Sequence, residues 1–188
     1  DDYKGQDHLL KQGASLRRAL DSNLIPSMIF WGPPGVGKTT LAHLIASHLE
    51  RPFYQLSAIS SGVKDVREVI QKVEKAGMFQ QSGTILFIDE IQESPKAIQL
   101  LRYFYEAFPD LHVIAAGSLL EFAMRKVKSF PVGRVEYMYL HPLNFIEYLE
   151  AIGHQAALEQ LNTLPPKSLA HSILLDLFNR YAIMGGMP

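Results

Sequence analysis

The sequence feature that most constrains the fold is a glycine-rich stretch between an apolar run and an amphipathic segment. Residues Gly32–Thr39 read Gly-Pro-Pro-Gly-Val-Gly-Lys-Thr and fit the pattern G-x-x-x-x-G-K-[ST] at every position. The stretch directly follows the apolar run Met28–Trp31, and apolar residues then recur at helical spacing to about Glu50. A strand, a loop and a helix in this order point successive backbone N–H groups at an anion. The stretch therefore predicts a phosphate-binding loop in a parallel sheet.

The remainder of the chain alternates between strand-like and helix-like segments, which favours a parallel sheet covered by helices on both faces. We expect an α/β fold: a three-layer αβα P-loop NTPase sandwich whose five-stranded parallel sheet has the order 5-1-4-3-2. The core would span residues 1–141, and a helical extension over 142–188 would pack on the same domain. The predicted strands are Met28–Trp31, Phe53–Leu56, Thr84–Ile88, Leu111–Ala116 and Val135–Leu140. The predicted helices cover about 9–20, 41–50, 66–77, 95–108 and 119–127, and the chain after Pro142.

A pair of acids follows the third predicted strand. Asp89 and Glu90 come after four apolar residues, in the Walker B arrangement. Because parallel strands end at one edge of a sheet, both carboxylates should emerge beside the phosphate loop. Asp89 would then hold Mg²⁺, and Glu90 would polarise the attacking water. The alternative is a pair of solvent-facing acids at a helix start, and the complete phosphate loop argues against it.

The two motifs together predict ATP and Mg²⁺ as ligands. Lys38 would supply a positive charge for the β- and γ-phosphates, and the Thr39 hydroxyl would join Asp89 as a magnesium ligand. The expected nucleotide-binding residues form one continuous run: Gly32, Pro33, Pro34, Gly35, Val36, Gly37, Lys38, Thr39 and Thr40.

Two further residues have both a functional and an ordinary interpretation. Ser118 ends the fourth predicted strand, and it would either sense the γ-phosphate or cap the following helix. Arg134 precedes the fifth strand, and it is either an arginine finger for a neighbouring subunit or a surface arginine. Trp31 and the aromatic cluster Tyr103–Phe108 are predicted to serve core or helix packing rather than to stack on bases.

Composition excludes several classes of protein. There is no cysteine, so neither disulfides nor thiolate zinc sites are available. Lys and Arg number 18 against 19 acids, and the net charge of −1 does not support nucleic-acid binding by this chain alone. No apolar run reaches the length needed to cross a bilayer, and no signal sequence is present, so we expect a cytoplasmic protein without membrane contact.

Several stretches of the first half resemble one family. Gly5–Leu9, Ser27–Gly32 with the following loop, Leu56–Ala58 and Ser61–Arg67 are similar to the bacterial replication-associated recombination ATPases (RarA), AAA+ relatives of clamp loaders. The resemblance covers residues 5–90. It implies a weak contact between the adenine and the segment around Gly5 and Gln6.

The second half, residues 84–188, resembles bacterial AAA-type ATPases that carry a C-terminal domain of unknown function. The stretches concerned are Gln92–Lys96, Val113–Ser118, Phe130–Arg134, His141–Leu143 and Gly185–Pro188. Two resemblances joined in one chain suggest a chimera with its junction in the shared strand Thr84–Glu90. They also imply that a later lid or C-terminal domain is absent.

Three hypotheses about function follow. The first is an AAA+ ATPase that depends on magnesium, from a protein associated with DNA replication or recombination, acting in a homo-oligomeric ring with a trans arginine. The second is a nucleotide-binding module with little turnover, because the lid and trans elements are missing. The third is a DNA-remodelling component, which the neutral charge does not favour.

Overall fold

The computed structural model describes residues 3–61, 63–77, 83–118, 135–161, 163 and 168–186. The chain divides into two compact units. One unit comprises His8–Leu140, and the other combines Asp1–Asp7 with His141–Pro188. We call them the sheet unit and the helical unit, and each is described by itself.

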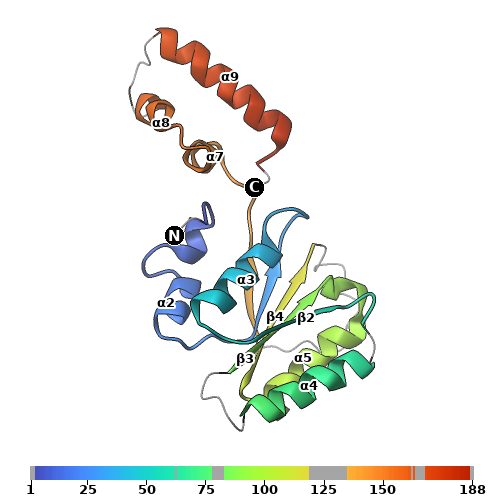
Figure 1. The fold of residues 1–188 in the computed structure, drawn as a ribbon. Coiled ribbons are helices and arrows are strands. Elements are labelled where there is room, and N and C mark those ends of the chain that lie inside the picture. The colour runs from blue at the N-terminus through green and yellow to red at the C-terminus, as the bar shows by residue number, and fades with distance from the viewer. Residues whose placement is uncertain are drawn as a thin grey trace. The chain divides into compact units, whose positions relative to one another are not determined.

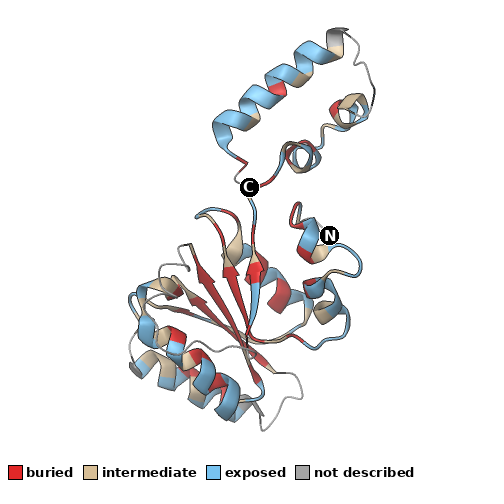
Figure 2. Ribbon diagram, turned by 180° about the vertical axis from the view of Figure 1, so that it is seen from behind, coloured by how far each residue is buried: buried red, intermediate tan, exposed pale blue. Residues whose placement is uncertain are grey.

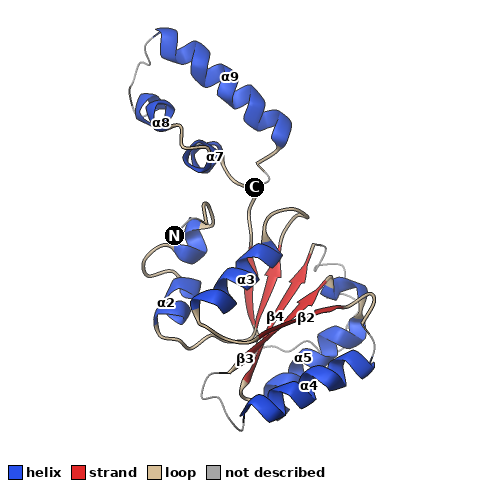
Figure 3. Ribbon diagram, viewed as in Figure 1, coloured by secondary structure: helices blue, strands red, loops and turns tan. Residues whose placement is uncertain are grey.

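The sheet unit contains one five-stranded parallel sheet (Figures 1 and 3). Its strand order is β2-β3-β4-β1-β5, which is the predicted order of 5-1-4-3-2 viewed from the opposite edge. The fold prediction is therefore confirmed, although the strand ends differ from their predicted positions by a residue in places. The strands are β1 (Met28–Trp31), β2 (Phe53–Ser57), β3 (Thr84–Asp89), β4 (Leu111–Gly117) and β5 (Glu136–Tyr139).

The pairing register brings the polar ends of the strands to one edge of the sheet. Trp31 of β1 pairs with Gly117 of β4 on one side and with Tyr139 of β5 on the other. Ser57 of β2 pairs with Asp89 of β3. Because all these pairs are parallel, the phosphate loop, the acidic pair and Ser118 follow from the same edge.

Helices cover both faces of the sheet in the sheet unit (Figure 1). On one face, α4 (Val63–Gly77) and α5 (Pro95–Ala107) pack on alternate strand residues such as Leu86, Ile88 and Ala115. The other face includes Phe53 and Phe87, whose rings stack at 5.9 Å between centroids, and α3 (Lys38–His48) lies against it, with His43 4.2 Å from Phe53. Figure 2 shows that the strands are mostly buried between these layers.

Two helix starts show how local sequence sets the elements. Ser94 caps α5, because its Oγ accepts a hydrogen bond from Ala97 N at 3.2 Å and Pro95 begins the helix. The first predicted helix is instead two helices, α1 (Asp7–Leu10) and α2 (Ser15–Asp21). Gly13 separates them with a φ of +87°, which a continuous helix cannot contain. The predicted helix over 119–127 lies outside the described residues.

The helical unit consists mainly of α7 (Phe145–Ala151), α8 (Gln155–Leu161) and α9 (Ser168–Met184). Its core contains Tyr148, Leu149, Ala157 and Leu177. Asn144 begins α7 with a capping box: its side chain accepts from Glu147 N at 3.0 Å, and Glu147 accepts from Asn144 N at 2.8 Å.

Residues up to Asp7 group with the helical unit, and the expected boundary between a core over 1–141 and an extension over 142–188 stays a prediction. Within the helical unit, the buried side chain of Gln6 pairs with the backbone of His141: its Nε2 donates to His141 O at 2.6 Å, and its Oε1 accepts from His141 N at 3.0 Å. The expected packing of residues 142–188 on the core stays a prediction. In the described part of the chain, no helix has the length and apolar character needed to span a membrane.

Candidate functional site

The glycine-rich stretch turns sharply from β1 into α3. Gly37 lies at the N-cap of α3 with a φ of +87°, a left-handed conformation that glycine adopts without strain. No side chain caps this helix, so its first N–H groups stay directed at the loop. At Gly32 the requirement for glycine is steric, because a Cβ there would lie 2.3 Å from the backbone oxygen of Leu140. The close approach of β5 therefore fixes where the loop starts.

Lys38 lies inside the loop and donates to its carbonyl groups. Its Nζ is 2.9 Å from Gly32 O and 2.8 Å from Pro33 O. Burial lowers the pKa of Lys38, while the charges of Glu90 and Asp89 act in the opposite direction. The ammonium group is therefore near both carboxylates, so the structure brings the loop lysine and the acidic pair together.

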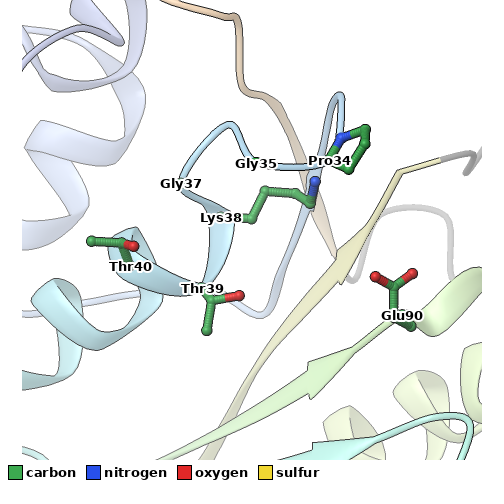
Figure 4. A pocket seen from close by; sticks show the side chains of 7 residues that line it. All are labelled: Pro34, Gly35, Gly37, Lys38, Thr39, Thr40 and Glu90. Carbon is green, nitrogen blue, oxygen red and sulfur yellow. The ribbon is translucent and has the colours of Figure 1, made fainter. Parts of the chain in front are cut away.

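A cavity of about 260 Å³ lies between the loop and the end of β3 (Figure 4). Figure 4 shows Lys38 along the inner side of the loop, with the Glu90 side chain facing it from the end of β3. Pockets for drug-sized ligands usually measure roughly 300–1,000 Å³, so this cavity suits the phosphate part of a nucleotide. Its lining residues are Pro34, Gly35, Gly37, Lys38, Thr39, Thr40 and Glu90.

Three predicted loop residues are not among those that line the cavity. Gly32 and Pro33 instead offer their carbonyl oxygens to Lys38. The Val36 side chain is only 1% exposed and belongs to the core, so any contact with a nucleotide would come from its backbone.

Backbone strain marks the junction between the two acids. Glu90 has a φ of +53° and a ψ of +41°, an uncommon left-handed conformation for a residue with a side chain. Such a residue costs on the order of 1–3 kcal/mol and persists only where its surroundings hold it. Asp89 contributes to this hold, because its Oδ1 accepts from Glu90 N at 3.0 Å, and Asp89 O accepts from Ala58 N at 2.9 Å. The left-handed conformation of Glu90 turns the chain away from the direction of β3, which ends at Asp89.

The residues present suit a magnesium ion that is shared with phosphate. Hydroxyl and carboxylate oxygens are hard ligands of the kind Mg²⁺ prefers, and Thr39 and Asp89 offer one of each. Thr39 lines the cavity, whereas Asp89 is not among its lining residues and has its Oδ1 bound to Glu90 N. Among the described residues there is no group of three or more His, Asp or Glu side chains that could hold a metal ion alone. Mg²⁺ commonly binds through one or two protein side chains plus substrate phosphates, so the donor set fits.

Gln92 is a site residue that the sequence did not single out. It lies in the short 3₁₀-helix η1 (Ile91–Glu93), and its Nε2 donates to Glu90 Oε2. The same nitrogen is 3.5 Å from Ser118 Oγ. Ser118 therefore lies near the acidic pair, with the Gln92 side chain between Ser118 and Glu90. The sequence shows an apolar residue, Ile91, directly after the acidic pair, and Ile91 is fully buried, but this residue does not predict the contact between Gln92 and Glu90.

The other predicted site residues lie elsewhere. Gly5 and Gln6 belong to the helical unit, so their contact with adenine stays a prediction. Arg134 lies outside the described residues, and its role as a finger stays a prediction. Trp31 packs against the core and meets Tyr139 edge-on at 4.4 Å, as expected. In the cluster Tyr103–Phe108, Phe104 is fully buried and Phe108 packs against the core, whereas Tyr103 and Tyr105 are half exposed. The Tyr103 ring contacts the rings of Phe104 and Phe108.

Comparison with known proteins agrees with this geometry. The sequence model of the family described as "AAA domain" matches residues 26–149. A replication-associated recombination protein A from Haemophilus influenzae is 37% identical over 154 residues, which is 82% of this chain and 34% of that protein. An uncharacterized AAA domain-containing protein from Mycobacterium tuberculosis is 48% identical over 99 residues, 53% of this chain and 22% of that protein. The chain thus spans about a third or less of these relatives.

Solved structures share the fold. The RuvB Holliday junction branch migration motor of Thermotoga maritima superposes with a TM-score of 0.55 at 26% identity, over 83% of this chain and 52% of that one. Neither sequence comparison supports a chimera, because the family match runs unbroken through Thr84–Glu90 and the Haemophilus match covers most of the chain. The chain belongs to the AAA domain family, has its P-loop fold, and is similar to the replication-associated recombination proteins.

Proposed function

We propose that this chain binds ATP with Mg²⁺ and hydrolyses it to ADP and phosphate. The observation that carries the proposal is the position of Glu90, which faces Lys38 across the cavity that the phosphate loop lines (Figure 4). An acid at this place distinguishes a hydrolase from a protein that only holds a nucleotide.

The roles follow from the chemistry of each group. The loop N–H groups and Lys38 would bind the β- and γ-phosphate oxygens, and Lys38 would exchange its two carbonyl partners for them. Thr39 and Asp89 would hold the magnesium ion, which neutralises charge on the phosphates when bound. Glu90 would orient a water whose oxygen bonds to the γ-phosphorus as the bond to the bridging oxygen breaks. The water proton passes to the Glu90 carboxylate, and the bridging oxygen takes the negative charge.

Steady-state phosphate release tests this proposal. Lys38→Ala should abolish turnover, and Glu90→Gln should lower it by about 10²–10⁴-fold, the usual contribution of general acid–base catalysis. The exposed residue Glu93 provides a matched control, because Glu93→Gln makes the same chemical change three residues away. Turnover by Glu90→Gln equal to that of the wild-type protein would refute the role assigned to Glu90.

A nucleotide-binding module with little turnover is the second candidate. A trans arginine would come from a second subunit, and the predicted finger Arg134 belongs to the part of the chain that is not described. This candidate predicts that ATP raises the melting temperature while phosphate release stays at trace level at every protein concentration. Turnover per chain that rises steeply with protein concentration would instead support an active ring.

A role in DNA replication or recombination is proposed from the relatives alone. One is named a replication-associated recombination protein, and the similar RuvB is a branch migration motor. The net charge of −1 argues that DNA binding by this chain would need a local patch or an assembly. Absence of binding to forked and single-stranded DNA at low salt, with and without ATP, would remove this part of the proposal. A cytoplasmic location stays a prediction.

A further inference from the structure

We propose that Gln92 is a positioning residue whose side-chain amide holds the Glu90 carboxylate and ties it to the end of β4. The inference rests on the proposed function, because it concerns the group that would activate water. It starts from the hydrogen bond that Gln92 Nε2 donates to Glu90 Oε2. Among the described residues, the Glu90 side chain has no other hydrogen-bond partner, so this contact decides where the carboxylate lies.

The orientation of the Gln92 amide follows from its surroundings. If the amide were turned over, its oxygen would face the Glu90 carboxylate, and two acceptors would meet without a proton between them. The nitrogen therefore faces Glu90, and its second hydrogen points toward Ser118 Oγ at 3.5 Å. This longer contact is at the limit of a hydrogen bond. It nevertheless places Ser118, the residue directly after β4, beside the amide.

The cost of this arrangement is visible at the amide oxygen. Gln92 Oε1 is buried and has no hydrogen-bond partner among the described residues. It lies over Gly117, where an added Cβ would be 2.6 Å away. A buried acceptor without a partner is uncommon and unfavourable. A glutamine is therefore not explained by packing alone, since a methionine of similar length would fill the same space without the penalty.

The backbone holds Gln92 firmly in this place. Ile91 beside it is fully buried, and Ser94 caps the next helix. Glu93 N donates to Glu90 O at 3.0 Å, and Ser94 N donates to Ile91 O at 3.2 Å, so η1 is a closed turn. Because Glu90 itself has a strained backbone, its side chain needs an anchor to keep one direction, and the closed turn presents Gln92 at the right distance.

Gln92→Met is the direct test, because it keeps the length and removes the amide. Gln160 is a matched control: its Oε1 is also buried and has no partner in the part of the chain that the structure describes, and it lies in α8 of the helical unit. We expect Gln92→Met to lower kcat by about 10- to 100-fold, as expected when a catalytic group moves by about 1 Å, with little change in the Kd for magnesium-ATP. Gln160→Met should leave both constants close to those of the wild-type protein.

A double-mutant cycle separates positioning from general damage. If Gln92 acts through Glu90, then Gln92→Met should have little further effect in the Glu90→Gln background. The same fold loss in both backgrounds would overturn the inference, as would wild-type kcat in Gln92→Met. Wild-type turnover in Lys38→Ala would instead refute the proposed function, so failure of the inference and failure of the proposed function are distinguishable.

Gln92→Glu gives a second test that does not depend on the Glu90→Gln background. It keeps the length of the side chain but replaces the amide donor by a carboxylate, which repels the Glu90 carboxylate. We expect kcat of Gln92→Glu to fall at least as far as that of Gln92→Met, with little change in the Kd for magnesium-ATP. If turnover by Glu90→Gln is below detection, this comparison decides, and wild-type kcat in Gln92→Glu would contradict the inference.

Discussion

The close approach of β5 to the start of the phosphate loop makes Gly32→Ala a sharp test of the site's architecture. A methyl group at Gly32 would lie 2.3 Å from Leu140 O, about 1 Å short of the 3.4 Å at which ordinary contact begins. The obstructing oxygen belongs to the backbone of Leu140, and the N–H of the same residue donates a hydrogen bond to Trp31 O at 2.8 Å. Neither strand end can therefore move away without breaking the pairing of β1 with β5.

Two costs combine at this position. Overpacking against rigid surroundings costs about 1–3 kcal/mol, and the φ of +153° at Gly32 adds roughly 1–3 kcal/mol for a residue with a side chain. We expect Gly32→Ala to lower the free energy of unfolding of the sheet unit by about 2–6 kcal/mol, which is a large part of a typical domain's 5–15 kcal/mol. Phosphate release should fall with it, because the loop starts at this residue.

Urea unfolding followed by fluorescence is the assay. Trp31 is the sole tryptophan of the chain and lies next to Gly32, so its emission reports on the sheet unit. Gly13→Ala is the matched control, because Gly13 has a φ of +87° in the same unit but nothing within 4 Å of an added Cβ. It should cost only about 1–2 kcal/mol. Equal losses in the two variants would refute the claim that β5 fixes the start of the loop.

Three further predictions concern stability. Ser27→Ala should destabilise the sheet unit by about 1–3 kcal/mol, because Ser27 Oγ accepts a hydrogen bond from the buried Val113 N at 3.1 Å and its loss leaves that N–H unpaired. An unchanged midpoint of urea unfolding would contradict this. Burial, then Arg51, lowers the pKa of His112. As the pH falls below about 6.5, the His112 imidazole is therefore protonated in the unfolded chain before it is protonated in the folded one, and this lowers the free energy of unfolding. Over that pH range the wild-type protein should lose more stability than the His112→Gln variant does. Parallel curves of unfolding free energy against pH for the two proteins would contradict this. Asn144→Ala should cost about 0.5–2 kcal/mol of stability, because it removes the capping box of α7. The unfolding midpoint measured by circular dichroism should fall in this variant, whereas Asn179→Ala at an exposed position of α9 should leave that midpoint nearly unchanged.

Much of the fold was predictable because burial on both faces leaves a simple trace in the sequence. Strands β1, β3 and β4 are largely apolar, and a glycine or an acid stands at or directly after the end of each one: Gly32, Asp89 and Gly117. The phosphate loop was predictable for a related reason: close backbone approach to an anion tolerates few residue types, so its glycines and lysine form a recognisable pattern.

What escaped prediction depends on side chains that meet across the chain. Gln92 touches Glu90 only because η1 closes a turn after a strained residue, and no spacing rule encodes that turn. Gln6 was assigned to the nucleotide by resemblance, and that contact stays a prediction. The hydrogen bonds of its amide to the backbone of His141, 135 residues away, were not predicted. Such long-range pairing leaves no periodic signal.

The central claim is that Lys38 and Glu90 act on one nucleotide with different roles, and a calorimetric titration of magnesium-ATP tests it most directly. We predict a single binding event in the wild-type protein and a similar Kd in Glu90→Gln, whose side chain would meet the water rather than the phosphates. Lys38→Ala should bind about 10- to 100-fold more weakly, the loss expected for one charge-assisted hydrogen bond to phosphate. Wild-type affinity in Lys38→Ala would contradict the account, because the nucleotide would then lie outside the loop.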